Sequence, residues 1–248
     1  MTDTTYESRV ITLPVERTLT AARRTAASAV DRQVAAVGSW AVDDWGRDPA
    51  FVASVGQLAS VRWNTVIGGV DRLPVRAGAL VVVNTRRWSL APIQVALAIT
   101  RETGRVARFV GRPDTAPIGA LARRLGGLLA RPDEIAGALR AGELLVMSAS
   151  PTLHPRRVGR VDHALVGAAV STRTAVFPAA TASSPVSRSA RIEIGPSLRP
   201  GRRRRGPLIE LELADQVQQR IQRMLDQFGG AQTGTPLDWL PLSGMGGS

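Results

Sequence analysis

From residue 62 onward, short apolar runs alternate with amphipathic stretches, and this alternation limits the fold more than any other feature of the chain. Runs such as 79–84 and 144–148 have the length and apolar content of buried strands. Strands that alternate with helices typically form a mostly parallel sheet covered by helices. We therefore predict an α/β fold. The expected strands are 62–67, 79–84, 105–110, 144–148, 175–180 and 190–194, and the expected helices between them are 89–101, 118–125, 133–140 and 161–172.

Helical segments flank this alternating region. The apolar spacing predicts an N-terminal helical hairpin over residues 14–38 and 48–61, in which Asp48 is the N-cap and Pro49 the first helical residue. Because its apolar face is mostly Ala and Val, packing on the main domain is favoured over insertion into a membrane. We expect a helical segment at 1–61, the α/β domain at 62–228 and a flexible tail at 229–248. The C-terminal helix, 207–228, carries one apolar stripe: Ile209, Leu213, Val217, Ile221 and Leu225.

Composition removes several kinds of chemistry. The 248 residues include no cysteine, so disulfides, thiolate metal sites and a cysteine nucleophile are excluded. His154 and His163 are the only histidines, which argues against a multi-histidine metal site. All 32 basic residues are arginine, so neither a lysine Schiff base nor a P-loop lysine is available. We expect no metal and no cofactor.

The net charge of +12 is unevenly distributed. Residues 1–60 carry 6 Arg and 7 acids, whereas residues 61–248 carry 26 Arg and 13 acids. A surface of this sign attracts anionic lipid headgroups, phosphorylated ligands or nucleic acid. The first residues lack a basic and then apolar signal sequence, and no run is long enough to span a bilayer. We expect a cytoplasmic protein, peripheral to the inner membrane.

Several sequence blocks occur in a fixed order over residues 40–228. They are Asp-Trp-Gly-Arg-Asp-Pro at 44–49, Gly-Val-Asp-Arg-Leu-Pro at 69–74, the strand followed by Asn-Thr-Arg-Arg at 84–87, the basic block 118–131, Gly-Glu-Leu-Leu-Val-Met-Ser-Ala-Ser at 142–150 and Ala-Val-Phe-Pro at 175–178. Together they resemble the glycerolphosphate/lysophospholipid acyltransferase (PlsC-like) family of the actinobacterial type. The resemblance implies that family's α/β fold.

The residues that perform catalysis in that family are replaced here. The family's Asn-His-x-x-x-x-Asp motif corresponds to residues 84–90, where the histidine position is Thr85 and the aspartate position is Leu90. In the family, the histidine deprotonates the acceptor hydroxyl and the aspartate orients the imidazole. Neither replacement can do this. In the Phe-Pro-Glu-Gly block the glutamate position is Ala149, so the motifs are degenerate at three separated positions.

Two kinds of function remain open for the cleft. A relocated base could come from His154, with Asp162 as its orienting carboxylate, which would leave an active acyltransferase for a lysophospholipid or glycolipid acceptor. The alternative, which we favour, is a pseudoenzyme that binds phospholipid or acyl-CoA or modulates an active acyltransferase paralogue. Arginine forks suit phosphate oxygens. The candidate ligand-binding residues are Arg86, Arg87, Arg131, Arg156 and Arg157.

A run of four arginines lies between the last strand and the last helix, framed by Gly and Pro residues that indicate an exposed loop. Residues 185–205 contain seven Arg and one Glu. Each basic residue near an anionic phospholipid membrane contributes about 1 kcal/mol to binding, so we predict that this run binds the membrane surface. Nucleic-acid association is less favoured, because no base-reading motif accompanies it. The predicted membrane-binding residues are Arg202, Arg203, Arg204 and Arg205.

Overall fold

The computed structural model describes residues 42–62, 64–87, 89–154, 156–183, 189–199 and 207–228. The chain divides into two compact units, Met1–Trp40 and Ala41–Ser248, and every described residue belongs to the second. The expected helix over 14–38, the four consecutive arginines at 202–205 and the tail at 229–248 lie outside the described residues. The helix expected over 48–61 is present and belongs to the same unit as the sheet.

Seven strands form one sheet among the described residues, in the order β1-β7-β6-β2-β5-β3-β4. All neighbouring pairs are parallel except β6 and β7, which are antiparallel. The predicted α/β class with a mostly parallel sheet is therefore confirmed. The strands are β1 (Asn64–Gly68), β2 (Ala79–Val83), β3 (Ala107–Val110), β4 (Gly127–Leu128), β5 (Leu144–Ser148), β6 (Ala175–Ser183) and β7 (Ser189–Ile194).

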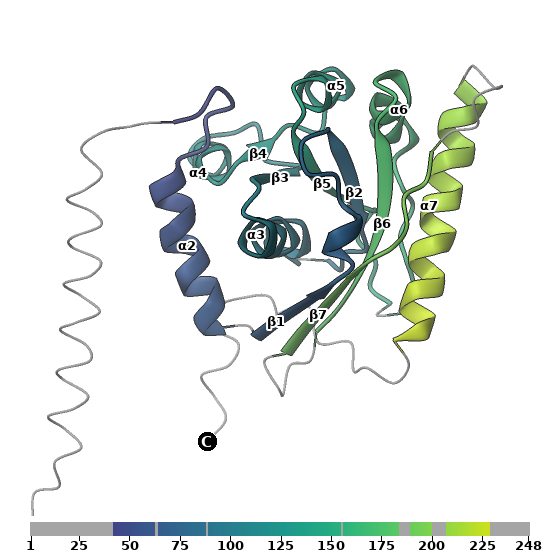
Figure 1. Ribbon diagram of the computed structural model, residues 1–248, viewed down its shortest axis with the longest axis horizontal. Helices are drawn as coiled ribbons and strands as arrows, with labels where there is room; N and C mark the ends of the chain where they lie inside the picture. Colours follow the sequence, from purple (N-terminus) through teal and green to yellow (C-terminus); the bar gives the residue numbers. More distant parts are fainter. Residues whose placement is uncertain are drawn as a thin grey trace, which may run out of the picture. The chain divides into compact units, whose positions relative to one another are not determined.

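Helices cover both faces of this sheet (Figure 1). One face packs against α5 (Pro132–Arg140), α6 (His163–Ser171) and α7 (Pro207–Gln227), and alternate residues of the central strands supply the core between them. The other face packs chiefly against α3 (Ala91–Thr103). The predicted apolar stripe of the C-terminal helix is confirmed, because Ile209, Leu213, Val217, Ile221 and Leu225 are all buried.

Three further elements complete the described fold: α2 (Pro49–Arg62), the short 3-10 helix η2 (Val70–Arg72) and α4 (Ile118–Arg124). Helix α2 begins as the sequence predicts. Asp48 Oδ1 accepts a hydrogen bond from the Phe51 backbone N–H (3.0 Å), which is the bond of an N-cap residue, and Pro49 follows. The helix lies beside α3 on the face opposite α7 (Figure 1).

Two ion-pair groups hold the segment before α2 on the domain. The buried guanidinium of Arg108 in β3 contacts Asp43 (2.6 Å) and Glu143 (2.9 Å). Arg124 in α4 contacts Asp48 Oδ2 (2.6 Å) and stacks on the Phe51 ring at 4.7 Å from its centroid. The block around residues 43–49 therefore has a structural role, because its carboxylates fix the N-terminal end of α2.

Candidate functional site

The positions that the family resemblance assigns to catalysis lie where β2 and β5 end. The two strands continue their parallel pairing beyond their last residues: Ala149 N–H donates to Val83 O (2.8 Å), and Thr152 N–H donates to Thr85 O (3.3 Å). Thr85 is 8% exposed and Ala149 is 1% exposed, so little of either side chain is accessible to a bound molecule.

Asn84, the residue before Thr85, strengthens this closed edge. Its amide accepts a hydrogen bond from the Thr181 backbone N–H (2.7 Å) and donates to Thr181 O (3.1 Å), which joins the end of β2 to β6. The Thr85 hydroxyl lies 3.4 Å from Arg86 O. The carboxyl edge of the sheet, where α/β folds place their ligands, is thus closed by hydrogen bonds at its centre.

Leu90 differs from the other two positions because its side chain is 40% exposed. It precedes the first residue of α3, and a tight turn brings it there: Ser89 N–H donates to Arg86 O (3.0 Å), and Ser89 Oγ accepts from Ala91 N–H (3.0 Å). Four residues therefore separate the closed edge from Leu90, which lines an apolar groove.

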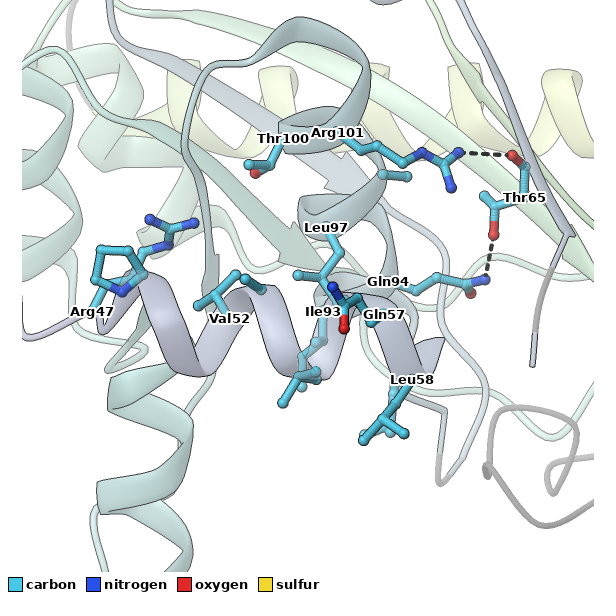
Figure 2. A pocket seen from close by; sticks show the side chains of 16 residues that line it. Arg47, Val52, Gln57, Leu58, Thr65, Ile93, Gln94, Leu97, Thr100 and Arg101 are labelled. Atoms are coloured by element: carbon cyan, nitrogen blue, oxygen red, sulfur yellow. Dashed lines mark hydrogen bonds between the residues drawn. The ribbon is translucent and has the colours of Figure 1, made fainter. Parts of the chain in front are cut away.

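The groove lies between α2 and α3 and has a volume of about 620 Å³. Apolar and small residues form most of it, including Val52, Val55 and Leu58 from α2 and Ile93 and Leu97 from α3. Its polar and charged lining residues are Arg47, Gln57, Thr65, Gln94, Thr100 and Arg101. Figure 2 shows Arg47 at one end of α2, and Gln94 and Arg101 of α3 both reaching toward Thr65 of β1.

Arg47 is the most buried charged residue of the groove, at 8% exposure. Burial lowers the pKa of its guanidinium from the ordinary value, the nearby Arg108 lowers it further, and the carboxylates of Asp43 and Glu143 act in the opposite direction. Arg47 places a cationic group at the end of the groove near the start of α2.

Sequence reasoning did not find this groove. It predicted both helices, but not that they lie side by side with space between them. The available signal was α3 itself, where Leu90, Ile93, Leu97 and Arg101 recur at helical spacing on a face that the sheet does not cover.

The structure brings four of the five predicted ligand-binding arginines to one loop region. Thr152 forms a parallel bridge with Arg86, and its carbonyl accepts from Arg87 N–H (3.2 Å). The Thr152 hydroxyl lies 3.0 Å from Arg157 O, which places Arg156 and Arg157 in the same region. We call Arg86, Arg87, Arg156 and Arg157 the arginine cluster.

Among the described residues, no contact joins Arg131 to the arginine cluster. It precedes α5, and its guanidinium pairs with Asp114 (2.9 Å), with both side chains more than 60% exposed. An exposed pair of this kind contributes little to stability.

His154 and Asp162 do not form the predicted base and orienter pair in this structure. His154 is exposed, and its Nδ1 accepts from the Arg156 backbone N–H (3.3 Å). Asp162 caps α6, since its Oδ1 accepts from Ala164 N–H (2.9 Å) and Leu165 N–H (3.3 Å). The carboxylate that was expected to orient the imidazole is thus used by a helix terminus.

The mostly parallel sheet, the helices on both faces and the motif positions at the carboxyl edge together define an acyltransferase-like α/β fold. A solved structure supports this. The chain is similar to the 1-acyl-sn-glycerophosphate (LPA) acyltransferase PlsC from Thermotoga maritima, with a TM-score of 0.53 and 17% sequence identity over 73% of this chain and 82% of that one. No protein-family model and no curated protein sequence matches the chain.

Among the described helices, none combines the length and the apolar character that crossing a membrane requires.

Proposed function

We propose that this chain is a catalytically inactive relative of acyltransferases that binds an anionic amphiphile, either acyl-CoA or a lysophospholipid. The acyl chain lies in the groove between α2 and α3, and the phosphate-bearing end lies on the arginine cluster. In this form the protein presents or withholds lipid, or modulates an active acyltransferase paralogue, at the surface of an anionic membrane.

One observation carries this proposal: the position that would hold the orienting aspartate is Leu90, which forms part of the groove wall. A carboxylate there would face apolar side chains, whereas leucine extends the apolar surface. Neither of the other two motif positions supplies a base, because a threonine hydroxyl and an alanine side chain cannot accept a proton near neutral pH, and both residues are buried. The changes thus disfavour proton transfer and favour apolar binding.

The size and the charge of the site agree with this ligand. A volume of about 620 Å³ is within the range of roughly 300–1,000 Å³ that small-molecule sites occupy. The arginine cluster begins one turn before Leu90, since Ser89 N–H closes a turn on Arg86 O. Guanidinium groups there can donate pairs of hydrogen bonds to phosphate oxygens.

The test is isothermal titration calorimetry with hexadecanoyl-CoA and with a lysophosphatidic acid. We expect the wild type to bind both, and Leu90→Asp to weaken binding by roughly tenfold or more because a carboxylate in the groove must be desolvated. Leu208→Asp is the matched control. Leu208 is 78% exposed at the start of α7, so this change should leave the dissociation constant within about twofold.

An acyl-transfer assay on the wild type and His154→Ala completes the test. Absence of turnover in both proteins, with binding retained, supports the proposal. Turnover that is lost in His154→Ala would establish a relocated base and an active enzyme. If neither ligand binds the wild type, the proposed function is wrong.

A further inference from the structure

Gln94 is a buried polar side chain in the wall of a mostly apolar groove. It is 6% exposed and lines the groove from α3. Its Nε2 donates to Thr65 Oγ1 (3.1 Å), whereas its Oε1 is buried and has no hydrogen-bond partner among the described residues. Figure 2 shows the amide extending from α3 toward Thr65.

The missing partner does not depend on how the amide is oriented. Rotation of the amide by 180° exchanges the nitrogen and the oxygen. Oε1 would then accept from the Thr65 hydroxyl, and Nε2 would take the place that lacks a partner. In either orientation one amide atom is unsatisfied, which costs about 1–3 kcal/mol in a buried place. A leucine or methionine would avoid this cost.

The position of Gln94 indicates which part of a bound chain it meets. Gln94 follows Leu90 by four residues, so it lies about 6 Å further along α3, at 1.5 Å per residue. Leu90 marks the end of the groove that adjoins the arginine cluster. In a lysophosphatidic acid only the glycerol separates the phosphate from the ester carbonyl. With its phosphate on that cluster, the acyl chain of such a ligand therefore passes Gln94 within its first few carbons.

We propose that the groove selects an acyl chain with a hydroxyl group near its carbonyl end, as in a 3-hydroxyacyl chain. This inference rests on the proposed function and specifies its ligand. A hydroxyl both donates and accepts, so it satisfies the amide in either orientation. A charged substituent is disfavoured, because the nearest cation on α3, Arg101, already contacts Glu102 at 3.1 Å.

The experiment compares three lysophosphatidic acids by calorimetry, which carry a hexadecanoyl, a 3-hydroxyhexadecanoyl or a 16-hydroxyhexadecanoyl chain. We expect the wild type to bind the 3-hydroxy chain about fivefold more tightly than the plain chain, the gain of one additional hydrogen bond. The 16-hydroxy chain should show no gain, since its hydroxyl lies at the far end. Gln94→Met should remove the preference by weakening only the 3-hydroxy ligand.

Gln94→Leu serves as a second variant in case the methionine variant does not fold, with circular dichroism as the check. Equal binding of the plain and 3-hydroxy chains by the wild type overturns this inference and leaves the proposed function intact. A preference that persists in both variants also overturns it, because the selecting group is then not Gln94. Binding of none of the three ligands shows that the proposed function fails for lysophospholipids, and it overturns this inference as well.

Discussion

At the scale of single residues, Arg108 is a side chain that holds the segment before α2 on the domain. Its side chain is 3% exposed and contacts Asp43 and Glu143, which come from segments 100 residues apart in the sequence. A buried cation with two partners is costly to desolvate, and its net contribution to stability is small when all partners are present. Removal of one partner destabilises the fold, because the remaining buried charges are then no longer neutralised.

We predict that Arg108→Met lowers the free energy of unfolding by about 2–3 kcal/mol at pH 7. This is below the roughly 3–5 kcal/mol of a fully buried pair, because Asp43 and Glu143 keep 32% and 21% of their side-chain surface exposed. Urea denaturation followed by circular dichroism measures the change. Arg131→Met, which removes an exposed pair with Asp114, should cost less than about 1 kcal/mol.

The same variant has a predictable dependence on pH. Burial acts to raise the pKa of Asp43, but hydrogen bonds from Arg108 and from the Arg47 and Trp45 amides outweigh it, so the pKa lies below its ordinary value of 3.8. A depressed carboxyl pKa stabilises the fold above the unfolded value and loses this effect as pH falls through the folded value. The deficit of Arg108→Met should therefore shrink as pH falls below about 4. A deficit that stays constant with pH would show that lost packing, not charge, is responsible.

At the scale of elements, the sequence predicted where α2 starts. It did not predict which other elements lie beside this helix. Asp48 and Pro49 specify an N-cap and a first turn through local chemistry, and the structure confirms both. The groove beside α2 depends on where α3 lies, and apolar or small residues occur all around α2, so no single face indicates its partner.

The limits of prediction for the strands and the site have similar physical reasons. The strand β4 has only two residues, too few for any periodicity, and the antiparallel direction of β7 is set by pairing that local sequence does not encode. The sequence assigned Thr85 and Ala149 to two separate motif positions. It could not show that they lie at neighbouring strand ends or that they are buried, because both depend on pairing and packing between segments about 65 residues apart.

Gly56 offers a test of the space between α2 and α3. No atom lies within 4 Å of the place where a Cβ would stand on Gly56, and the residue lines the groove. We predict that Gly56→Ala raises the free energy of unfolding by about 0.5–1 kcal/mol through helix propensity. Gly56→Trp should fill the groove and weaken hexadecanoyl-CoA binding by roughly tenfold or more.

Gly104 is the matched control for Gly56→Ala. It also has open space around it, but its φ of +67° is unfavourable for a side chain, so Gly104→Ala should lower stability by about 1 kcal/mol. Thermal and urea unfolding give both values. If Gly56→Trp binds the ligand as tightly as the wild type does, the chain lies elsewhere and the groove assignment is wrong.

At the scale of the whole molecule, the positive charge is unevenly distributed along the chain. Residues 1–60 contribute a net charge of −1 and residues 61–248 contribute +13. The arginine cluster lies at the carboxyl edge of the sheet. A positively charged protein of this kind is attracted to anionic surfaces over distances of about a Debye length, roughly 10 Å at 0.1 M salt.

We predict binding to vesicles that contain anionic phospholipid, measured by co-sedimentation, and little binding to vesicles of neutral lipid. Replacement of Arg202, Arg203, Arg204 and Arg205 by Gln should weaken binding by up to about three orders of magnitude at low salt, from about 1 kcal/mol per arginine. Duplex DNA at matched salt is the competitor. Stronger retention on DNA than on vesicles would favour a nucleic-acid role instead.

The closed edge between β2 and β5 also bears on what a complete family motif would require here. With Thr85→His and Leu90→Asp, residues 84–90 would match the Asn-His-x-x-x-x-Asp pattern, yet the imidazole would begin at a position that is only 8% exposed, on a segment paired with residues 149–152. Under the proposed function, these two substitutions are therefore not sufficient for catalysis, because the imidazole also needs space at this edge.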